Sequence, residues 1–261
     1  MRDITLWQVF LSLIFVAVAL VFSGYFKVRM GKDIVVSALR AFVQLLAIGY
    51  ILTFLFEVES PLYIVLMVAV MVAVASYNSG RRGEKVPNSF LISSLAIFTT
   101  TFLTVLVLSG FGIIPFEAQF IIPVSGMVVG NVMNGASLAL MRLDDELKSN
   151  RLRVEAALSL GATPLQAATP ALKKAVTTAM VPVVDRAKVV GIVSLPGGMS
   201  GMILAGASPL AAVKFQIVIM YMLLGSPFLT VAIVNLLAYR QYFNRQRQLV
   251  LRPSPEPASQ D

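Results

Sequence analysis

The chain has 261 residues, of which 57% are hydrophobic and only 13% charged, and its mean hydropathy is +0.83. A soluble domain of this length cannot bury so much apolar surface, so the composition excludes a soluble enzyme. Cysteine and histidine are absent, which excludes disulfides, thiolate metal sites and the usual Ser-His and Cys-His catalytic groups. The net charge of +8 lies in short loops between apolar runs, a pattern that indicates membrane topology rather than nucleic-acid binding.

Seven apolar windows approach the roughly 20 residues that a helix needs to cross about 30 Å of hydrocarbon. They do not alternate as barrel strands do, so we predict an all-α, polytopic membrane protein with about seven transmembrane helices and a cytoplasmic loop. The expected spans lie near 4–24, 34–56, 61–77, 90–109, 118–140, 189–207 and 212–238. We expect the first span to be retained rather than cleaved as a signal peptide.

These spans form one transmembrane domain, 4–240, interrupted by the loop 141–188 and followed by a tail, 241–261. Lys and Arg gather after the first, third, fifth and seventh spans, and the alternate loops contain none. The positive-inside rule therefore places the N-terminus outside the cell and the C-terminus in the cytoplasm. We expect the chain to lie in the inner (plasma) membrane. We expect the Pro-rich end of the tail, from Arg252, to be disordered.

Three carboxylates occupy the expected outer loops: Glu57, Glu59 and Glu117. They suit a negative mouth for a departing cation, but we favour the interpretation that they begin helices, where acids are stabilised by the helix dipole, or that they simply cannot lie in lipid.

The span 118–140 carries a polar and thioether face. Gly126 and Gly130 have the Gly-x-x-x-Gly spacing that lets helices approach closely, and amides are costly to expose to hydrocarbon. Two readings stay open here, a lining for a cation path and a helix interface held by amides. Candidate path residues in this span and in 189–207 are Asn131, Asn134, Met127, Met133, Ser137, Met199 and Met202.

The span 189–207 contains Pro196, Gly197 and Gly198 near its middle. We expect the helix to break there and to free backbone carbonyls that can coordinate a hard cation. The metal ligands themselves stay unknown at this point. Asp185, Arg186 and Lys188 precede the span, and we expect them at the membrane interface.

The loop 141–188 has the signals of organised helices. Asp144–Glu146 suit a helix start, and Gly161 suits a left-handed helix end. Thr163-Pro164 and Thr169-Pro170 are each typical of an N-cap followed by proline at the first helical position. The apolar stripe of the first helix comprises Leu147, Leu152, Ala156 and Leu160. We predict a helix, a turn, a short helix, a turn and a further helix.

Glu155-Ala156-Ala157, followed by three residues and Gly161, resembles the EAA-x-x-x-G loop of prokaryotic ABC-transporter permeases. Val154–Ala162 and Ser194–Gly201 resemble stretches of FetB-type iron export permeases, a family related to plant aluminium-tolerance permeases, and the likeness covers roughly residues 5–245. It implies a coupling helix that docks into a cytoplasmic ATPase subunit. The implied coupling residues are Glu155, Ala156, Ala157, Gly161, Ala162, Thr163 and Pro164.

The resemblance implies a permease subunit that exports a metal cation, iron, and works with a second copy of itself and two ATPase subunits in membrane lipid. The sequence has no Walker A motif, so we expect a non-enzyme that binds no cofactor, with ATP and Mg used by the partner. Alternatives are a secondary carrier or channel uncoupled from ATP, and a membrane enzyme, which the missing His, Cys and acidic pairs disfavour.

The coupling segment has two alternative readings of its own, a plain pair of surface helices and a helix-turn-helix that reads DNA. Its tether between two spans disfavours DNA, and we expect no nucleic-acid partner.

Overall fold

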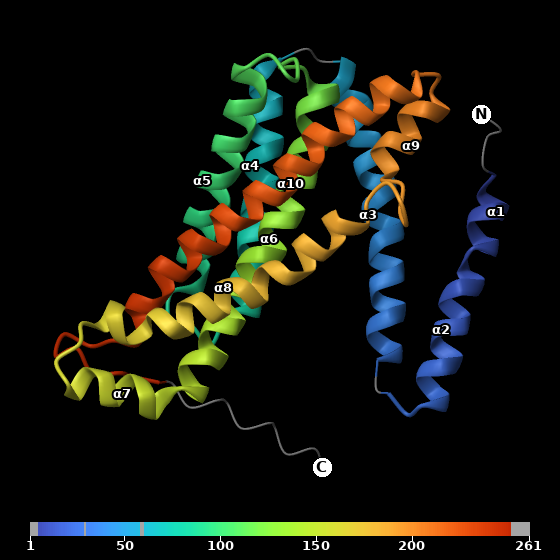
Figure 1. Ribbon diagram of the computed structural model, residues 1–261. Coiled ribbons are helices and arrows are strands. Elements are labelled where there is room, and N and C mark those ends of the chain that lie inside the picture. The colour runs from blue at the N-terminus through green and yellow to red at the C-terminus, as the bar shows by residue number, and fades with distance from the viewer. Residues whose placement is uncertain (1–4, 29, 58–59, 252–261) are drawn as a thin grey trace. The chain divides into compact units, whose positions relative to one another are not determined.

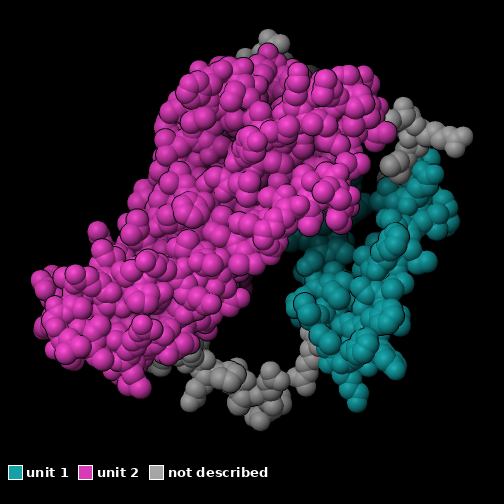
Figure 2. Space-filling model, viewed as in Figure 1, with its two compact units in different colours: residues 1–59 teal, residues 60–261 magenta. Residues whose placement is uncertain are grey.

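The computed structural model describes residues 5–28, 30–57 and 60–251 (Figure 1). Arg2, Glu59 and the tail from Arg252 lie outside the described residues, so the expectations for them have no structural counterpart. The described residues form helices and no named β-strand, and the prediction of an all-α, polytopic membrane protein is confirmed. The chain divides into two compact units, residues 1–59 and 60–261 (Figure 2).

The first unit is a helical hairpin built from α1 (Leu6–Leu11), α2 (Leu13–Tyr25) and α3 (Gly31–Glu57). A capping box between Thr5 and Gln8 starts α1. No side chain of α2 is buried, and apolar side chains such as Phe15, at 78% exposed, point outward. A helix that exposes apolar side chains on all sides is suited to contact with lipid or with another protein chain rather than with water.

The second unit is a bundle arranged around one long helix, α6. Its elements are α4 (Pro61–Arg82), α5 (Ser89–Gly110), α6 (Ala118–Ser149), α7 (Arg151–Ser159), α8 (Pro164–Val189), α9 (Gly197–Leu204), α10 (Pro209–Ala238) and a 3₁₀ turn, η1 (Tyr239–Tyr242). α6 packs against α4, α5, α8 and α10. Val128, Val132 and Leu140 of α6 are fully buried, so the core of the unit lies along this helix.

Small residues let α4 approach its neighbours closely. A Cβ atom at Gly80 would stand 2.8 Å from the Cα of Phe90 on α5, and one at Gly83 would overlap the side chain of Leu140 on α6. Ser89 donates a hydrogen bond of 2.9 Å to the carbonyl of Gly80 and closes the α4–α5 hairpin. Such small residues and hydroxyl contacts replace the hydrophobic effect as the cohesive forces between membrane helices.

Six helices are long and apolar enough to cross a membrane within the described residues, against the seven that we expected. They are Trp7–Tyr25, Gly31–Thr53, Pro61–Arg82, Ser89–Gly110, Ala118–Ser149 and Pro209–Tyr242. The difference lies at 189–207, which is not one helix: α8 ends at Val189, and α9 begins only at Gly197. Gly191, at φ +86°, turns the chain out of α8, and its N–H donates to the carbonyl of Ser194.

Two expectations for the loop 141–188 are wrong. Asp144–Glu146 do not start a helix, because α6 continues through them to Ser149 with Leu143 and Leu147 fully buried. Thr169-Pro170 does not start one either, since both residues lie inside α8, where the Thr169 hydroxyl donates to the carbonyl of Leu165 at 2.6 Å. Pro170 lacks the N–H that would reach the carbonyl of Gln166, and the buried residues around it, Ala168 and Ala171, hold α8 continuous in spite of this loss.

The expected apolar stripe is also not one buried face. Leu147 is buried at the end of α6, whereas Leu152 and Leu160 are 82% and 90% exposed. α6 and α7 are separate helices that meet at Asn150, so residues on either side of it do not share a face.

Candidate functional site

The first candidate site is the elbow, which we define as α7 and the turn that follows it, residues 151–163. Figure 1 shows the elbow at the end of the bundle, beyond the membrane-length helices, where it connects α6 to α8. Both of these helices continue from the elbow into the core of the unit, where they pack against each other. α7 is therefore attached at both of its ends to helices of the bundle core.

The exposed surface of α7 is apolar along one row. Leu152, Ala156 and Leu160 follow one another at four-residue intervals and are all exposed, whereas Val154 on the opposite side is buried. Glu155 accepts a hydrogen bond of 2.7 Å from Arg151 beside this row. An apolar row with a polar border on an otherwise charged segment is typical of a protein-binding surface.

The turn after α7 is fixed by local hydrogen bonds. Gly161 has φ +91°, a left-handed conformation that favours glycine, and the N–H of Ala162 donates to the carbonyl of Ala157 at 3.0 Å. Thr163 caps α8 by accepting from the N–H of Gln166, while Pro164 occupies the first helical position. The expected left-handed stop and the Thr163 cap are confirmed, and together they make the elbow a rigid connection.

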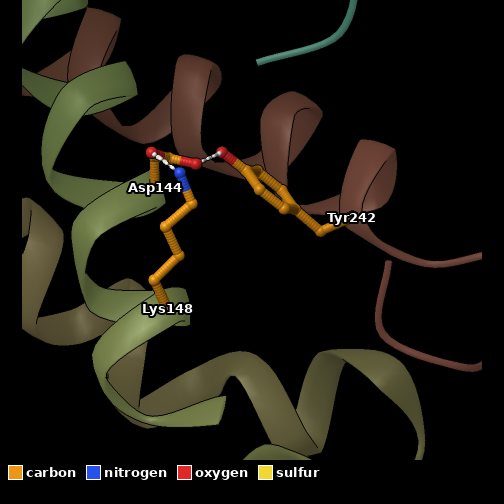
Figure 3. Close-up of polar contacts among 3 residues, drawn as sticks. All are labelled: Asp144, Lys148 and Tyr242. Atoms are coloured by element: carbon orange, nitrogen blue, oxygen red, sulfur yellow. Dashed lines mark hydrogen bonds and ion pairs between the residues drawn. The ribbon is translucent and has the colours of Figure 1, made fainter. Parts of the chain in front are cut away.

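A buried ionic contact holds the base of the elbow (Figure 3). The carboxylate of Asp144, only 2% exposed, accepts a hydrogen bond of 2.9 Å from the Tyr242 hydroxyl and one of 2.8 Å from Lys148. Tyr242 belongs to η1 at the end of α10, so the contact ties the last helix to α6 shortly before the elbow. A carboxylate in such a place is tolerated only because both oxygens have charged or polar partners.

Sequence reasoning missed this contact. Tyr242 lies 98 residues from Asp144, and no local pattern links them. One signal was present: Asp144 stands between Leu143 and Leu147 within the apolar period of α6, where a lone acid requires a partner.

The candidate path residues of α6 divide into two groups. Met127, Asn131 and Asn134 lie on one partly exposed face, where Asn131 donates to the carbonyl of Met127 at 2.8 Å. Ser137 is buried at 2% exposed and donates to the carbonyl of Met133, so it belongs to the packed side of the helix. The structure therefore places the two amides together and Ser137 apart from them.

Both amides bind arginines from neighbouring helices. The side-chain oxygen of Asn131 accepts from Arg186 of α8 at 3.2 Å, and that of Asn134 accepts from Arg82 of α4 at 3.4 Å. Sequence analysis placed neither arginine in the path. The amides on α6 were visible in the sequence, but their partners are 55 and 52 residues away.

The remaining candidates lie around the interruption between α8 and α9. Pro196 is the N-cap of α9, and Gly197 and Gly198 are its first residues, so the non-helical segment precedes these glycines. Met199 borders a cavity of about 380 Å³ between this segment, α9 and α10, and Met202 does not. Other residues of its lining are Val190, Leu195, Gln216, Met220 and Tyr221.

Clusters of metal-ligating side chains are a further candidate site within the described residues, 5–28, 30–57 and 60–251. No group of three or more His, Cys, Asp or Glu residues in those ranges is placed to hold a metal ion. Glu117, one of the three outer-loop acids, is the N-cap residue of α6 and accepts from the side chain of Gln119 at 2.8 Å.

Membrane-length helices, of which α4, α5 and α10 pack against α6, together with an organised elbow, define a polytopic α-helical membrane protein. The model of the uncharacterised protein family UPF0014 matches residues 6–243, and the chain belongs to this family.

Three relatives cover nearly the whole chain. A UPF0014 membrane protein of Bacillus subtilis (strain 168), YjkA, is 40% identical over 92% of this chain and 96% of its own length. The Escherichia coli (strain K12) protein named as a probable iron export permease, FetB, is 37% identical over 96% of both chains. The Arabidopsis thaliana protein ALUMINUM SENSITIVE 3 is 37% identical over 91% of this chain and 87% of its own. The resemblance to FetB-type permeases and to plant aluminium-tolerance permeases is thereby confirmed. No solved structure matches the chain significantly.

Proposed function

We propose that this protein is the membrane-spanning permease subunit of an ABC transporter that exports a metal cation, iron, from the cytoplasm. ATP hydrolysis takes place in a separate ATPase subunit. The name of the Escherichia coli relative, an iron export permease, supports the cargo and the direction of transport. The EAA-like residues of the elbow support the ATPase partner.

The observation that carries the proposal is the exposed apolar row on α7. Leu152 of α7 and Leu160, the C-cap residue that follows it, are 82% and 90% exposed on an elbow that lies outside the membrane-length helices. A short helix with such a surface gains stability when a partner covers it, because about 25 cal/mol is gained for each Å² of apolar surface removed from water. The small side chains of Ala156 and Ala157 let the surface of the partner approach the backbone of α7.

The elbow suits the transfer of a conformational change. Gly161 and the Thr163 cap hold its turn, and the contact between Asp144 and Tyr242 holds its base. A movement of the ATPase against α7 would therefore displace α6 and α8 together instead of deforming a loose loop. Transmission of this kind uses binding energy from the partner, and the chain itself needs no nucleotide.

The remaining assignments follow from the same proposal. The chain lies in the inner membrane with its N-terminus outside and its C-terminus and elbow in the cytoplasm, since Lys and Arg gather in the loops on that side. It works as two copies with two ATPase subunits. It is not an enzyme and binds no cofactor, while ATP and Mg are bound by the partner.

The test is co-purification with the ATPase subunit, whose gene we expect next to that of this protein. Leu152→Asp and Leu160→Asp each place a charge in the apolar row, and bulky residues at Glu155 or Gly161 obstruct it. We expect each change to abolish co-purification and the stimulation of ATP hydrolysis. Val250→Asp is the matched control, because Val250 is also exposed, at 51%, but lies in the C-terminal segment.

An ATPase that still binds all four elbow variants would refute the assignment of the coupling helix. Transport that continues in vesicles without ATPase, driven by an ion gradient, would instead support the secondary carrier.

A further inference from the structure

Four residues from three helices meet on the outward face of α6. Asn131 and Asn134 are separated by three positions, which brings their Cβ atoms to within about 5–6 Å on an α-helix. Each amide oxygen accepts a hydrogen bond from an arginine, Asn131 from Arg186 on α8 and Asn134 from Arg82 on α4. Both guanidinium groups therefore reach the same face of α6, one from α4 and one from α8. We call these four residues the amide–arginine cluster.

The cluster carries positive charge that no carboxylate offsets within the described part of the chain. The ion pairs there are Arg142–Asp145, Lys148–Asp144, Arg151–Glu155 and Lys188–Asp185. Asp185 precedes Arg186 in the sequence, but its carboxylate pairs with Lys188, with 2.9 Å between Oδ1 of Asp185 and Nζ of Lys188. Each guanidinium has five N–H donors, and a single amide oxygen occupies only one of them.

Under the orientation proposed above, Asn131 and Arg186 lie at membrane depth, whereas Arg82, the last residue of α4, lies at the cytoplasmic end of its helix. Ala118 begins α6 at the outer surface, and a rise of 1.5 Å per residue places Asn131 about 20 Å and Asn134 about 24 Å further along the helix. The hydrocarbon core is about 30 Å thick. Under this orientation Arg186, which the sequence placed at the membrane interface, lies beside Asn131 in the spanning part of α6.

Charged groups at this depth are rarely in contact with lipid and generally line a water-filled cavity. Arg82 and Arg186 are both exposed in the single subunit. In a permease, a charged surface that faces a water-filled cavity is a candidate lining for the path of the cargo, and its charge would select what passes.

Bare metal cations are poorly suited to this surface. Two arginines repel a cation, and the repulsion is stronger in a low-dielectric surround than in water. The amide oxygens, which could ligate a metal, already accept from the arginines, and the amide N–H of Asn131 is bonded to Met127. The paired N–H donors of arginine instead match the oxygens of carboxylates and phosphates.

We propose that the amide–arginine cluster binds an oxygen-rich anion of the carboxylate or phosphate type, so that the metal crosses this permease as an anionic complex rather than as a bare cation. This inference rests on the proposed transport function and adds the chemical form of the cargo.

The experiment measures binding to the full-length permease in phosphatidylcholine nanodiscs, without the ATPase. The probes are citrate alone, ferric citrate and Fe²⁺ alone. We expect both citrate species to bind, more weakly at high salt, and Arg82→Gln and Arg186→Gln each to weaken their binding at least tenfold. Arg186→Lys keeps the charge but loses the paired donors, so we expect an intermediate loss.

The control is Arg245→Gln, which removes an exposed positive charge from the C-terminal segment and is expected to bind citrate like the wild type. Equal elution in size-exclusion chromatography and equal helical circular dichroism show that each variant is folded. If Arg186→Gln does not fold, Arg82→Gln and Arg186→Lys carry the test.

The inference is overturned if citrate does not bind while Fe²⁺ alone does, and if the arginine variants bind Fe²⁺ as tightly as the wild type does. It is also overturned if phosphatidylglycerol in the nanodisc abolishes citrate binding, since the cluster would then hold a lipid phosphate rather than cargo. Loss of co-purification with the ATPase leaves this binding result unaffected, so failures of the two proposals are distinguishable.

Discussion

Replacing Tyr242 by phenylalanine removes one hydroxyl from the buried contact that joins the end of α10 to α6. The side chain of Asp144 is 3% exposed, and its carboxylate would keep Lys148 but lose the bond of 2.9 Å from the tyrosine. Hydrogen bonds to charged groups are worth about 1.5–3 kcal/mol when the charged partner stays buried. The contribution of Lys148 is smaller than that of a fully buried partner, because its side chain is 26% exposed.

We therefore expect Tyr242→Phe to lower the free energy of unfolding by about 1.5–3 kcal/mol, a large part of the stability of an ordinary domain. Thermal unfolding of the detergent-solubilised protein, followed by fluorescence-detected size-exclusion chromatography, measures the change. Limited proteolysis should cut the variant faster within residues 239–251, because η1 is no longer held to α6.

The matched control is Tyr221→Phe, since Tyr221 is 72% exposed and loses no buried bond. If Tyr242→Phe melts at the same temperature as this control and the wild type, the contact with Asp144 contributes nothing and the reasoning is wrong.

Two further changes test the packing of α4 and the turn of the elbow. Gly83→Val should sharply lower the yield of folded protein, because a side chain at this position overlaps Leu140. The control, Gly110→Val, should be tolerated, because no atom lies within 4 Å of the Cβ position of Gly110. Equal yields of the two variants would contradict the α4–α6 packing. Thr163→Ala should destabilise the protein by about 1 kcal/mol through loss of the α8 cap, as measured by thermal unfolding. Thr163→Ser retains the hydroxyl and should be as stable as the wild type. If it is instead as unstable as Thr163→Ala, the hydroxyl cap does not stabilise α8.

The sequence predicted well those features that depend on a single stretch of chain. Apolar runs of helical length identified the membrane helices, because a bilayer leaves few alternatives to a helix. Gly161 and Thr163 were identified as a helix end and a helix start because their effect comes from their own backbone conformation and from neighbours a few residues away.

Features that depend on distant residues could not be predicted in this way. Asp144 suggested a helix start because acids are common there, but burial against η1 gives it a different role. Thr169-Pro170 has the same local pattern as Thr163-Pro164, yet the buried Ala168, Ala171 and Ala175 keep α8 continuous past it. Packing of small residues against α6 outweighed the local preference.

The candidate site was predicted in part for the same reason. Asn131 and Asn134 stood out as amides within an apolar span, but Arg82 and Arg186 had been assigned to loops and interfaces. Only the antiparallel packing of α8 along α6 places Arg186 at the depth of Asn131.

The seven non-helical residues between Val189 and Gly197 separate α8 from α9. A continuous helix carries rotation about its axis from one end to the other, whereas a helix interrupted by a turn passes on displacement but little rotation. Under the proposed orientation, α8 would be able to twist toward the inner face of the membrane while α9 keeps its orientation near the outer face. Independent inner and outer halves are what a transporter requires if its two gates are never to be open at the same time.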